Sequence, residues 1–159
     1  MKTGAIVLII VIIIIVIAGI VIFQNRSISE ESANQEISEA KLLAGSISPY
    51  YEFNKELYDK ALDENKLVFL YFYADWCPIC AKEQRDATLP AFNEIEKDNL
   101  IGFRIHYNDG KVNQIEKDLA KQFGITYQHT KVILKDGKQV LKDLNSWDKD
   151  KYLEELNKY

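Results

Sequence analysis

The chain has 159 residues and a formal net charge of −4, and 28% of its residues are charged. This length suits one domain with short appendages. A mildly acidic chain without a basic stripe is a poor candidate for binding nucleic acid, which excludes a polyanionic partner. No nucleotide, flavin or haem motif is present in the sequence, so we expect no cofactor.

The N-terminal segment is strongly apolar. Residues 5–23 (AIVLIIVIIIIVIAGIVIF) are 19 consecutive apolar or small residues without a charge. At ~1.5 Å per residue, such a helix spans roughly the ~30 Å hydrocarbon layer of a bilayer. A cleaved secretory signal is the alternative, but its apolar region is shorter, ~7–15 residues, and ends at a small-residue cleavage site. No such site follows here, so we expect residues 1–23 to be an uncleaved transmembrane anchor in the cell membrane.

The residues around this anchor predict its orientation and a linker. Lys2 precedes the apolar run and Arg26 follows it. Counting the α-amino group with Lys2, the positive-inside rule places the N-terminus in the cytoplasm and the rest of the chain outside it. Residues 24–46 are polar, rich in Ser, Glu and Asn, with only a faint helical period, and are predicted to form a tether. Residues 47–159 then form the folded domain.

From residue 48 onward, hydrophobic periodicity and the capping and turn residues predict alternating strands and helices. In chain order these are an extended segment at 49–53, a helix at 55–65 capped by Asn54, a strand at 66–73, a helical stretch at 78–97 interrupted at Pro90, a strand at 100–107, a helix at 111–124, a hairpin at 130–144 around Asp136-Gly137, and a C-terminal helix capped near Ser146 or Asp148.

The strand at 66–73 (KLVFLYFY) is apolar on both faces. This pattern is typical of a central strand whose sheet is covered on both sides. The order of the elements therefore predicts an α/β fold, a mixed central sheet with helices on both faces, preceded by one N-terminal transmembrane helix.

Both cysteines of the chain lie two residues apart in ADWCPIC, residues 74–80, directly after this central strand. A single Cys-x-x-Cys pair cannot supply the four ligands of a structural zinc site, and the chain has only two histidines. A structural disulfide that closes so short a loop constrains the unfolded chain little. We therefore interpret the pair as redox-active.

The position of each cysteine suggests its role. Cys77 is expected at the start of a helix, where unpaired backbone amides and the helix dipole favour a thiolate. Pro78 suits the first helical turn, since its fixed φ fits and its missing N–H costs nothing there. Cys80 is expected to attack the mixed disulfide that Cys77 forms and to release the partner. Trp76 is expected to shield the sulfurs from water. The interpretation requires that Cys77 is not sunk in the interior.

The motif ADWCPIC between an apolar strand and a helix, with the downstream GIT…KVILKDGK segment, resembles the W-C-x-x-C signature and the hairpin of the thioredoxin superfamily over about residues 48–159. This resemblance implies the thioredoxin-like fold and a thiol-disulfide oxidoreductase that exchanges disulfides with protein thiols, here tethered to the outer face of a membrane. The Pro-Ile spacing resembles that of glutaredoxins and disulfide-forming oxidoreductases, which suggests a more oxidising pair. The oligomeric state is left open.

Two positions depart from the family pattern that the resemblance implies. The family's buried acid, six residues before the first cysteine, falls on Tyr71. A phenol is a poor base near neutral pH, so Asp75, Glu83 or water would have to assist. The family's cis-proline and the threonine after it, opposite the disulfide, fall on His129 and Thr130. A cis bond before a non-proline residue costs ~2.5–4 kcal/mol, so we expect a trans bond before His129.

His129 admits three interpretations. Charged, its imidazole would lower the pKa of Cys77; neutral, it could accept or relay the proton of Cys80. With the two thiolates it would form a soft-metal site for copper(I) or zinc, which makes a metallochaperone using Cys77, Cys80 and His129 the alternative function. It could also be a replacement that the fold tolerates. The second histidine, His106, is predicted to lie on the sheet surface.

Overall fold

The computed structural model describes residues 40–159. The predicted anchor at 1–23 and residues 24–39 of the predicted tether lie outside the described residues. Among the helices of residues 40–159, none combines the length and the hydrophobicity needed to cross a membrane.

The described chain alternates strands and helices, as predicted. The elements are β1 (Leu42–Ala44), β2 (Tyr50–Glu52), α2 (Lys55–Asp63), β3 (Leu67–Tyr73), α3 (Pro78–Glu83), the π-helix η1 (Gln84–Thr88), α4 (Leu89–Glu94), β4 (Leu100–His106), α5 (Gln114–Gln122), β5 (Thr130–Lys135), β6 (Lys138–Asp143) and α6 (Lys149–Asn157).

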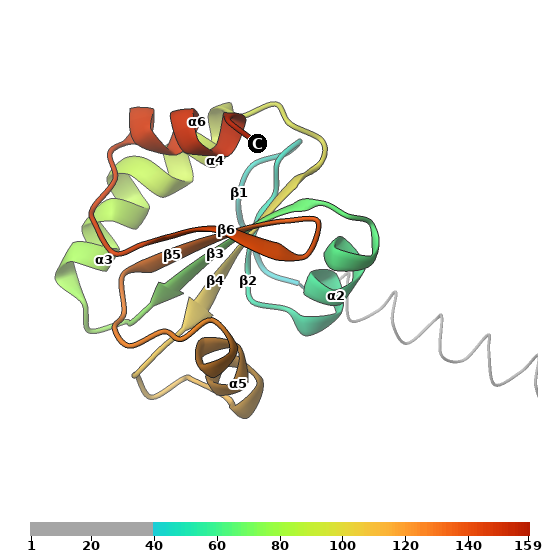
Figure 1. The fold of residues 1–159 in the computed structure, drawn as a ribbon. Helices are drawn as coiled ribbons and strands as arrows, with labels where there is room; N and C mark the ends of the chain where they lie inside the picture. Colours follow the sequence, from blue (N-terminus) through green and yellow to red (C-terminus); the bar gives the residue numbers. More distant parts are fainter. Residues whose placement is uncertain (1–39) are drawn as a thin grey trace, which may run out of the picture. The chain divides into compact units, whose positions relative to one another are not determined.

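These strands form one mixed sheet in the order β1-β2-β4-β3-β5-β6. Strands β2, β4 and β3 run parallel, while β1, β5 and β6 each pair antiparallel to a neighbour. Helices α3, α4 and α6 cover one face of the sheet, and α2 and α5 cover the other (Figure 1). The predicted α/β fold, a mixed sheet with helices on both faces, is confirmed.

Strand β3 lies at the centre of this sheet, and all of its residues are buried. Side chains alternate between the two faces of a strand, so β3 contributes to two separate cores. Phe69 and Tyr71 belong to the core under α3, α4 and α6, which also contains both cysteines. Leu70 and Phe72 belong to the core under α2 and α5. The apolar run therefore forms the predicted central strand, and the cysteine pair follows directly from its end.

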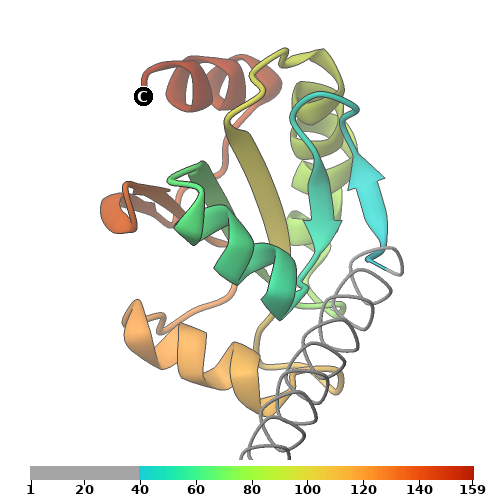
Figure 2. The same ribbon diagram turned by 90° about the vertical axis from the view of Figure 1, so that its right-hand side faces the viewer.

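Strand β1 lies within the segment 24–46 for which the sequence predicted a polar tether. Leu42 pairs with Tyr51 and Ala44 with Tyr50, which places β1 at the edge of the sheet (Figure 2). Ala44 is buried, and this contact with the core stabilises the strand. A strand of three residues is too short to show a periodicity of two, so the sequence pattern did not reveal it.

The helical stretch after the cysteines runs from 78 to 94 rather than to the predicted 97, and Pro90 does not split it. The N–H of Leu89 bonds to the carbonyl of Gln84, five residues back, which gives the wider π turn. Pro90 has no N–H to continue the usual pattern, and the π turn before it accommodates the ring. The helix ends where Ile95 adopts an extended conformation.

The predicted caps and the hairpin turn are present. Asn54 accepts a hydrogen bond from the N–H of Leu57, and Asp148 caps α6 in the same way. Asn113 forms a capping box, so α5 begins at Gln114 rather than at the predicted 111. The turn residues Asp136 and Gly137 have φ values of 51° and 69°, which is the left-handed pair that a tight hairpin requires.

Gly102 on β4 is required by close packing. A Cβ at this position would lie 2.6 Å from ring atoms of both Tyr50 and Phe92. These rings are fully buried and stacked 4.7 Å apart, so neither can move away easily. We expect Gly102→Ala to lower the free energy of unfolding by about 1–3 kcal/mol, measured by urea denaturation. Gly110→Ala is the matched control, because its Cβ would meet nothing within 4 Å; equal losses in both variants would contradict the packing argument.

Candidate active site

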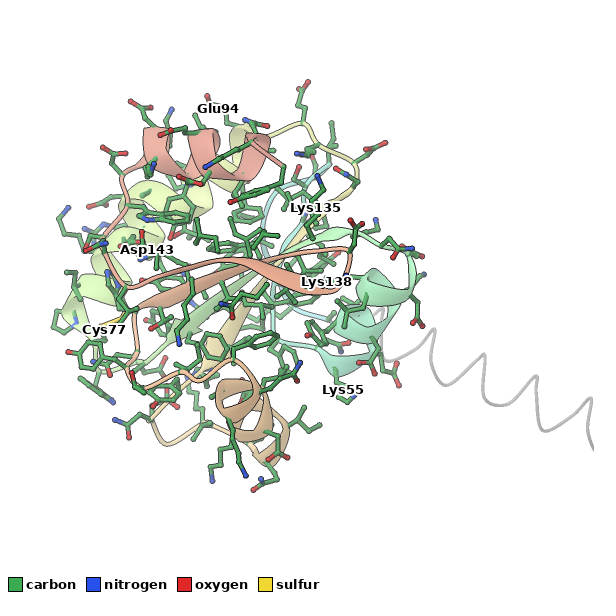
Figure 3. The ribbon with its side chains drawn as sticks, in the orientation of Figure 1. Lys55, Cys77, Glu94, Lys135, Lys138 and Asp143 are labelled. Carbon is green, nitrogen blue, oxygen red and sulfur yellow. A yellow bond between two sulfur atoms is a disulfide. The ribbon has the colours of Figure 1, made fainter. Side chains whose placement is uncertain are left out.

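Cys77 and Cys80 form a disulfide at the start of α3, with their Cα atoms 5.3 Å apart. Cys77 is the N-cap of the helix, and its Sγ accepts a hydrogen bond from the N–H of Cys80 at 3.2 Å. Pro78 occupies the first helical turn. Figure 3 shows Cys77 where β3 has ended and α3 begins. The predicted placement of the first sulfur at a helix N-terminus is confirmed, and the backbone there favours a thiolate.

The surface around the disulfide is apolar and the sulfurs are largely covered. Cys77 is 3% exposed and Cys80 is fully buried, whereas Trp76 and Ile79 are 55% and 50% exposed. Cys77 is buried, which the sequence did not predict, but it lies at the start of a helix and follows an exposed residue, as the redox interpretation requires. The indole Nε1 of Trp76 donates to the carbonyl of Asn108 at 2.8 Å, which fixes this ring against the loop after β4. Its shielding of the sulfurs stays a prediction.

His129 immediately precedes β5 and is held in an unusual backbone conformation. Its N–H donates to the carbonyl of Phe72 at 2.7 Å. None of the peptide bonds in residues 40–159 is cis, so the expected trans bond before His129 is confirmed. The residue has a φ of 71°, in the left-handed region that a histidine rarely occupies. Thr130 is buried, and its hydroxyl donates to the carbonyl of Tyr127 at 2.7 Å. Thr130 thus shapes the loop next to His129.

The imidazole of His129 joins Tyr71 to Glu83. Its Nδ1 lies 2.7 Å from the hydroxyl of Tyr71. Its Nε2 lies 3.0 Å from Oε2 of Glu83 and 3.0 Å from the hydroxyl oxygen of Ser146. Burial raises the pKa of Tyr71, so the phenol keeps its proton and donates it to Nδ1. The hydrogen-bond network therefore assigns the neutral imidazole proton to Nε2, where it faces Glu83 and Ser146.

Glu83 is buried on α3 and forms an ion pair with a buried lysine. Nζ of Lys131 lies 2.9 Å from Oε1 of Glu83, and the hydroxyl of Tyr152 donates to the same oxygen at 2.7 Å. Burial opposes ionisation of Glu83, but the adjacent imidazole of His129 and the charge of Lys131 outweigh it and the pKa of Glu83 is lowered, although its Oε2 accepts no hydrogen bond among the described residues. Lys131 also donates to the carbonyl of Asn145 at 2.6 Å. Both buried charges therefore have partners.

Of the two acids suggested to assist Tyr71, only Glu83 is connected to it. Asp75 is exposed, and its carboxylate lies 2.7 Å from Nζ of Lys111, in a surface ion pair. Lys131 and Tyr152 were not predicted as site residues from the sequence. The sequence does hold a sign that Lys131 is buried. Lys131 lies in the strand segment TKVIL, two residues before Ile133, and side chains two residues apart in a strand face the same side. Ile133 faces the core, so Lys131 faces it too.

The predicted metal-ligand set is not assembled. Within residues 40–159, one group of three His, Cys, Asp or Glu side chains has its ligand atoms within 4.8 Å of one another, and it consists of Asp75, His106 and Asp109. Cys77, Cys80 and His129 form no such group in this part of the chain, and both ring nitrogens of His129 already have hydrogen-bond partners.

The acidic group around His106 is accounted for by internal contacts. Nδ1 of His106 lies 2.8 Å from Oδ2 of Asp109, while Asp75 pairs with Lys111. His106 is partly buried at the end of β4, as its predicted position on the sheet surface allows.

Comparisons with known proteins agree with this geometry. The family model described as Thioredoxin matches residues 49–158. A "Thioredoxin-like protein" of Fusarium culmorum is 32% identical over 87 residues, which cover 55% of this chain and 66% of the relative. "Thioredoxin H4" of Arabidopsis thaliana is 33% identical over 85 residues, which cover 52% of this chain and 62% of the relative. The chain thus spans less than two thirds of the length of these curated relatives.

A solved structure shows the same fold. The thioredoxin of Aeropyrum pernix superposes with a TM-score of 0.55 at 19% sequence identity, covering 75% of this chain and 92% of that chain. At this identity the likeness concerns the fold alone.

Proposed function

This chain belongs to the thioredoxin family, and on that premise we propose that it is a thiol-disulfide oxidoreductase that acts on protein thiols and disulfides through Cys77 and Cys80. The observation that carries the proposal is the disulfide at the N-terminus of α3, in which the first sulfur caps the helix. In that position the reduced Cys77 is stabilised as a thiolate, the form that attacks disulfides.

The reaction proceeds by two exchanges. In the reducing direction, the thiolate of Cys77 attacks a substrate disulfide, forms a bond to one substrate sulfur, and releases the other as a thiolate. The thiolate of Cys80 then attacks Cys77, which restores the disulfide and releases the second substrate thiolate. In the oxidising direction the same steps run backwards. The reduction potential decides the direction, and ~30 mV corresponds to ~1.4 kcal/mol for this two-electron couple.

An apolar surface next to the disulfide supports a protein substrate. Trp76, Ile79 and Tyr127 are each at least half exposed, and they lie on the two segments that carry the disulfide and His129. Exposed aromatic and aliphatic side chains of this kind bind extended or unfolded protein segments by burying apolar area. Trp76, Pro78 and the loop held by Thr130 are proposed to form the docking surface.

The proposal includes attachment to a membrane. The apolar run at 5–23 supports a single-pass anchor, and the distribution of Lys2 and Arg26 supports a domain outside the cytoplasm. We expect the full chain to stay in the membrane during alkaline extraction. We also expect protease added to intact cells to digest residues 40–159. Release of the chain by alkaline carbonate would contradict the anchor.

The function is tested on the full chain purified in detergent. We expect the reduced protein to reduce the disulfides of insulin, its own pair being regenerated by dithiothreitol, with no copper or zinc retained after dialysis. Protein whose two thiols have been alkylated is the control and should be inactive. Stoichiometric retained copper or zinc together with no disulfide exchange would contradict the oxidoreductase and favour the metallochaperone.

A further inference from the structure

The loop that follows β4 holds the two residues directly before Cys77. The carbonyl of Asn108 accepts a hydrogen bond from the indole Nε1 of Trp76 at 2.8 Å. Oδ2 of Asp109 accepts one from the backbone N–H of Asp75 at 3.1 Å. Asp75 and Trp76 are exposed and belong to no helix or strand, so their position depends on bonds of this kind.

The carboxylate of Asp109 is covered although it lies in a surface loop. Its side chain is 3% exposed. Oδ2 lies 2.8 Å from Nδ1 of His106, and Oδ1 accepts a hydrogen bond from the N–H of Lys111 at 2.9 Å. Burial opposes ionisation of Asp109, but His106 and the N–H groups of Lys111 and Asp75 outweigh it, and the pKa of Asp109 is lowered. The side chain is therefore an ionised acceptor at neutral pH, and the hydrogen-bond network assigns the proton on Nδ1 to the side of His106 that faces it.

Building on the proposed function, we propose that Asp109 is a positioning residue that holds Trp76 ready to dock protein substrates. Asp109 restrains Trp76 at both ends. Its carboxylate holds the backbone of Asp75, the residue before Trp76. Its own backbone follows Asn108, whose carbonyl holds the indole. The main chain and the ring of Trp76 are thus both fixed by one short loop.

This restraint matters for protein substrates because of the exposed area of Trp76. Its side chain is 55% exposed, and an aromatic ring of this kind contributes binding free energy by burying apolar area against a partner. A ring and a backbone that are ordered before binding lose less freedom when the partner arrives. Without the Asp109 carboxylate, part of this ordering has to occur in the complex, and the protein substrate binds more weakly.

The sulfur of Cys77 is held by different contacts. Its Sγ accepts a hydrogen bond from the N–H of Cys80 at 3.2 Å, and its backbone N–H donates to the carbonyl of Ala74 at 3.0 Å. Neither contact involves the loop after β4. A small disulfide needs little more than access to this sulfur, so the loss of the Asp109 carboxylate should weaken the docking of protein chains more than the attack on a small disulfide.

The same loop offers a matched control. Nζ of Lys111 lies 2.7 Å from Oδ2 of Asp75, and the two side chains are 66% and 42% exposed. An exposed ion pair of this kind contributes little, because water and salt screen it. Lys111→Met removes the ion pair but keeps the backbone N–H that donates to Asp109. It therefore alters the surface between the loop and Asp75 without removing the acceptor for the N–H of Asp75.

The proposal is tested with a protein disulfide and a small one on the full chain in detergent. Reduction of insulin, with dithiothreitol as the final reductant, gives kcat and KM. The first thionitrobenzoate released from 5,5′-dithiobis(2-nitrobenzoate) by the reduced chain reports attack on a small disulfide. We expect Asp109→Ala to raise KM for insulin about three- to tenfold, with kcat and the first release each changed less than about twofold. Lys111→Met should match the wild type in all three quantities.

Each other outcome has a defined meaning. An unchanged KM in Asp109→Ala would overturn the positioning role and leave the oxidoreductase standing. Equal losses with insulin and with the small disulfide would place the effect on the sulfur or on folding, and would also overturn it. The same rise of KM in Lys111→Met would assign the effect to the surface ion pair instead. Failure of the wild-type chain to react with either disulfide would overturn the oxidoreductase, and the positioning role with it.

A measurement on the unaltered protein covers the case in which Asp109→Ala does not fold. The backbone N–H of Asp75 lies in an exposed segment and donates to the Asp109 carboxylate. We expect this N–H to exchange with solvent deuterium at least about tenfold more slowly than in an unstructured peptide, measured by nuclear magnetic resonance. Exchange at the rate of the unstructured peptide would show that Asp109 does not hold this segment, and would contradict the proposal.

Discussion

Cys77→Ser is expected to abolish disulfide exchange, whereas Cys80→Ser is expected to stop the reaction at a stable mixed disulfide. Cys77 caps α3 and is 3% exposed, while Cys80 is fully buried. A serine hydroxyl cannot form a bond to sulfur under these conditions, so the first exchange fails completely without Cys77. Without Cys80 the first exchange proceeds, but no group is placed to release the substrate.

The two variants are distinguished by mass. After incubation with a disulfide-containing protein, Cys80→Ser should carry one covalently bound substrate that dithiothreitol removes, and Cys77→Ser should carry none. Ala81→Ser, at an exposed position of the same helix, is the matched control and should turn over like the wild type. Undiminished turnover by Cys77→Ser would refute its assignment as the attacking residue, and trapping through Cys80 instead would reverse the order of the two cysteines.

Lys131→Met is expected to cause the largest loss of stability, about 3–5 kcal/mol in the free energy of unfolding, because it leaves the buried Glu83 without its cation. Lys131 has no exposed surface, and its Nζ lies 2.9 Å from Oε1 of Glu83. Urea denaturation at pH 7 measures the loss. Lys135→Met is the matched control, since Lys135 is exposed at the end of the same strand (Figure 3) and should change stability little.

The second arm of this test replaces both charges. Lys131→Met combined with Glu83→Leu removes the unpaired carboxylate, and replacement of a buried ion pair by apolar residues of similar volume is often close to neutral. The double variant should therefore recover most of the loss of the single one. A double variant as unstable as the sum of the two single variants would show that the charges contribute independently.

The pH dependence of stability follows from the same pair. The pKa of Glu83 is lowered in the folded protein from an ordinary value of 4.5, so its contribution to stability is present above pH 4.5 and is lost as the pH falls through the lower folded pKa. In Lys131→Met the cation that helps to lower the pKa of Glu83 is absent, so this pKa is higher in the variant than in the wild type. The difference in unfolding free energy between wild type and variant should therefore shrink between pH 7 and pH 4; a constant difference would contradict the assignment.

Much of the fold follows from local sequence patterns. The apolar run of β3, the cap at Asn54 and the turn at Asp136-Gly137 each act over a few residues, and each was predicted where the structure has it. Strand β1 was not, because three residues carry no detectable period. The sequence predicted an interruption at Pro90, but a π turn before this residue accommodates the proline without a break.

The candidate site was predictable only in part. The disulfide and its helix follow from two cysteines close together in the chain. The hydrogen bond between Tyr71 and His129 joins residues 58 positions apart, and the one between Tyr152 and Glu83 joins residues 69 positions apart. Such contacts depend on how β5 pairs with β3 and how α6 packs over the sheet, which no local pattern specifies.

The pairing of Glu83 with Lys131 also constrains how this site can change over evolutionary time. A lineage that loses either charge alone passes through a chain with an isolated ion in its interior, a step that selection on abundance opposes. Among descendants of the same ancestor, the two positions are therefore expected to be exchanged together, both ionic or both apolar. An alignment rich in sequences that keep one charge without the other would show that the interior tolerates the intermediate.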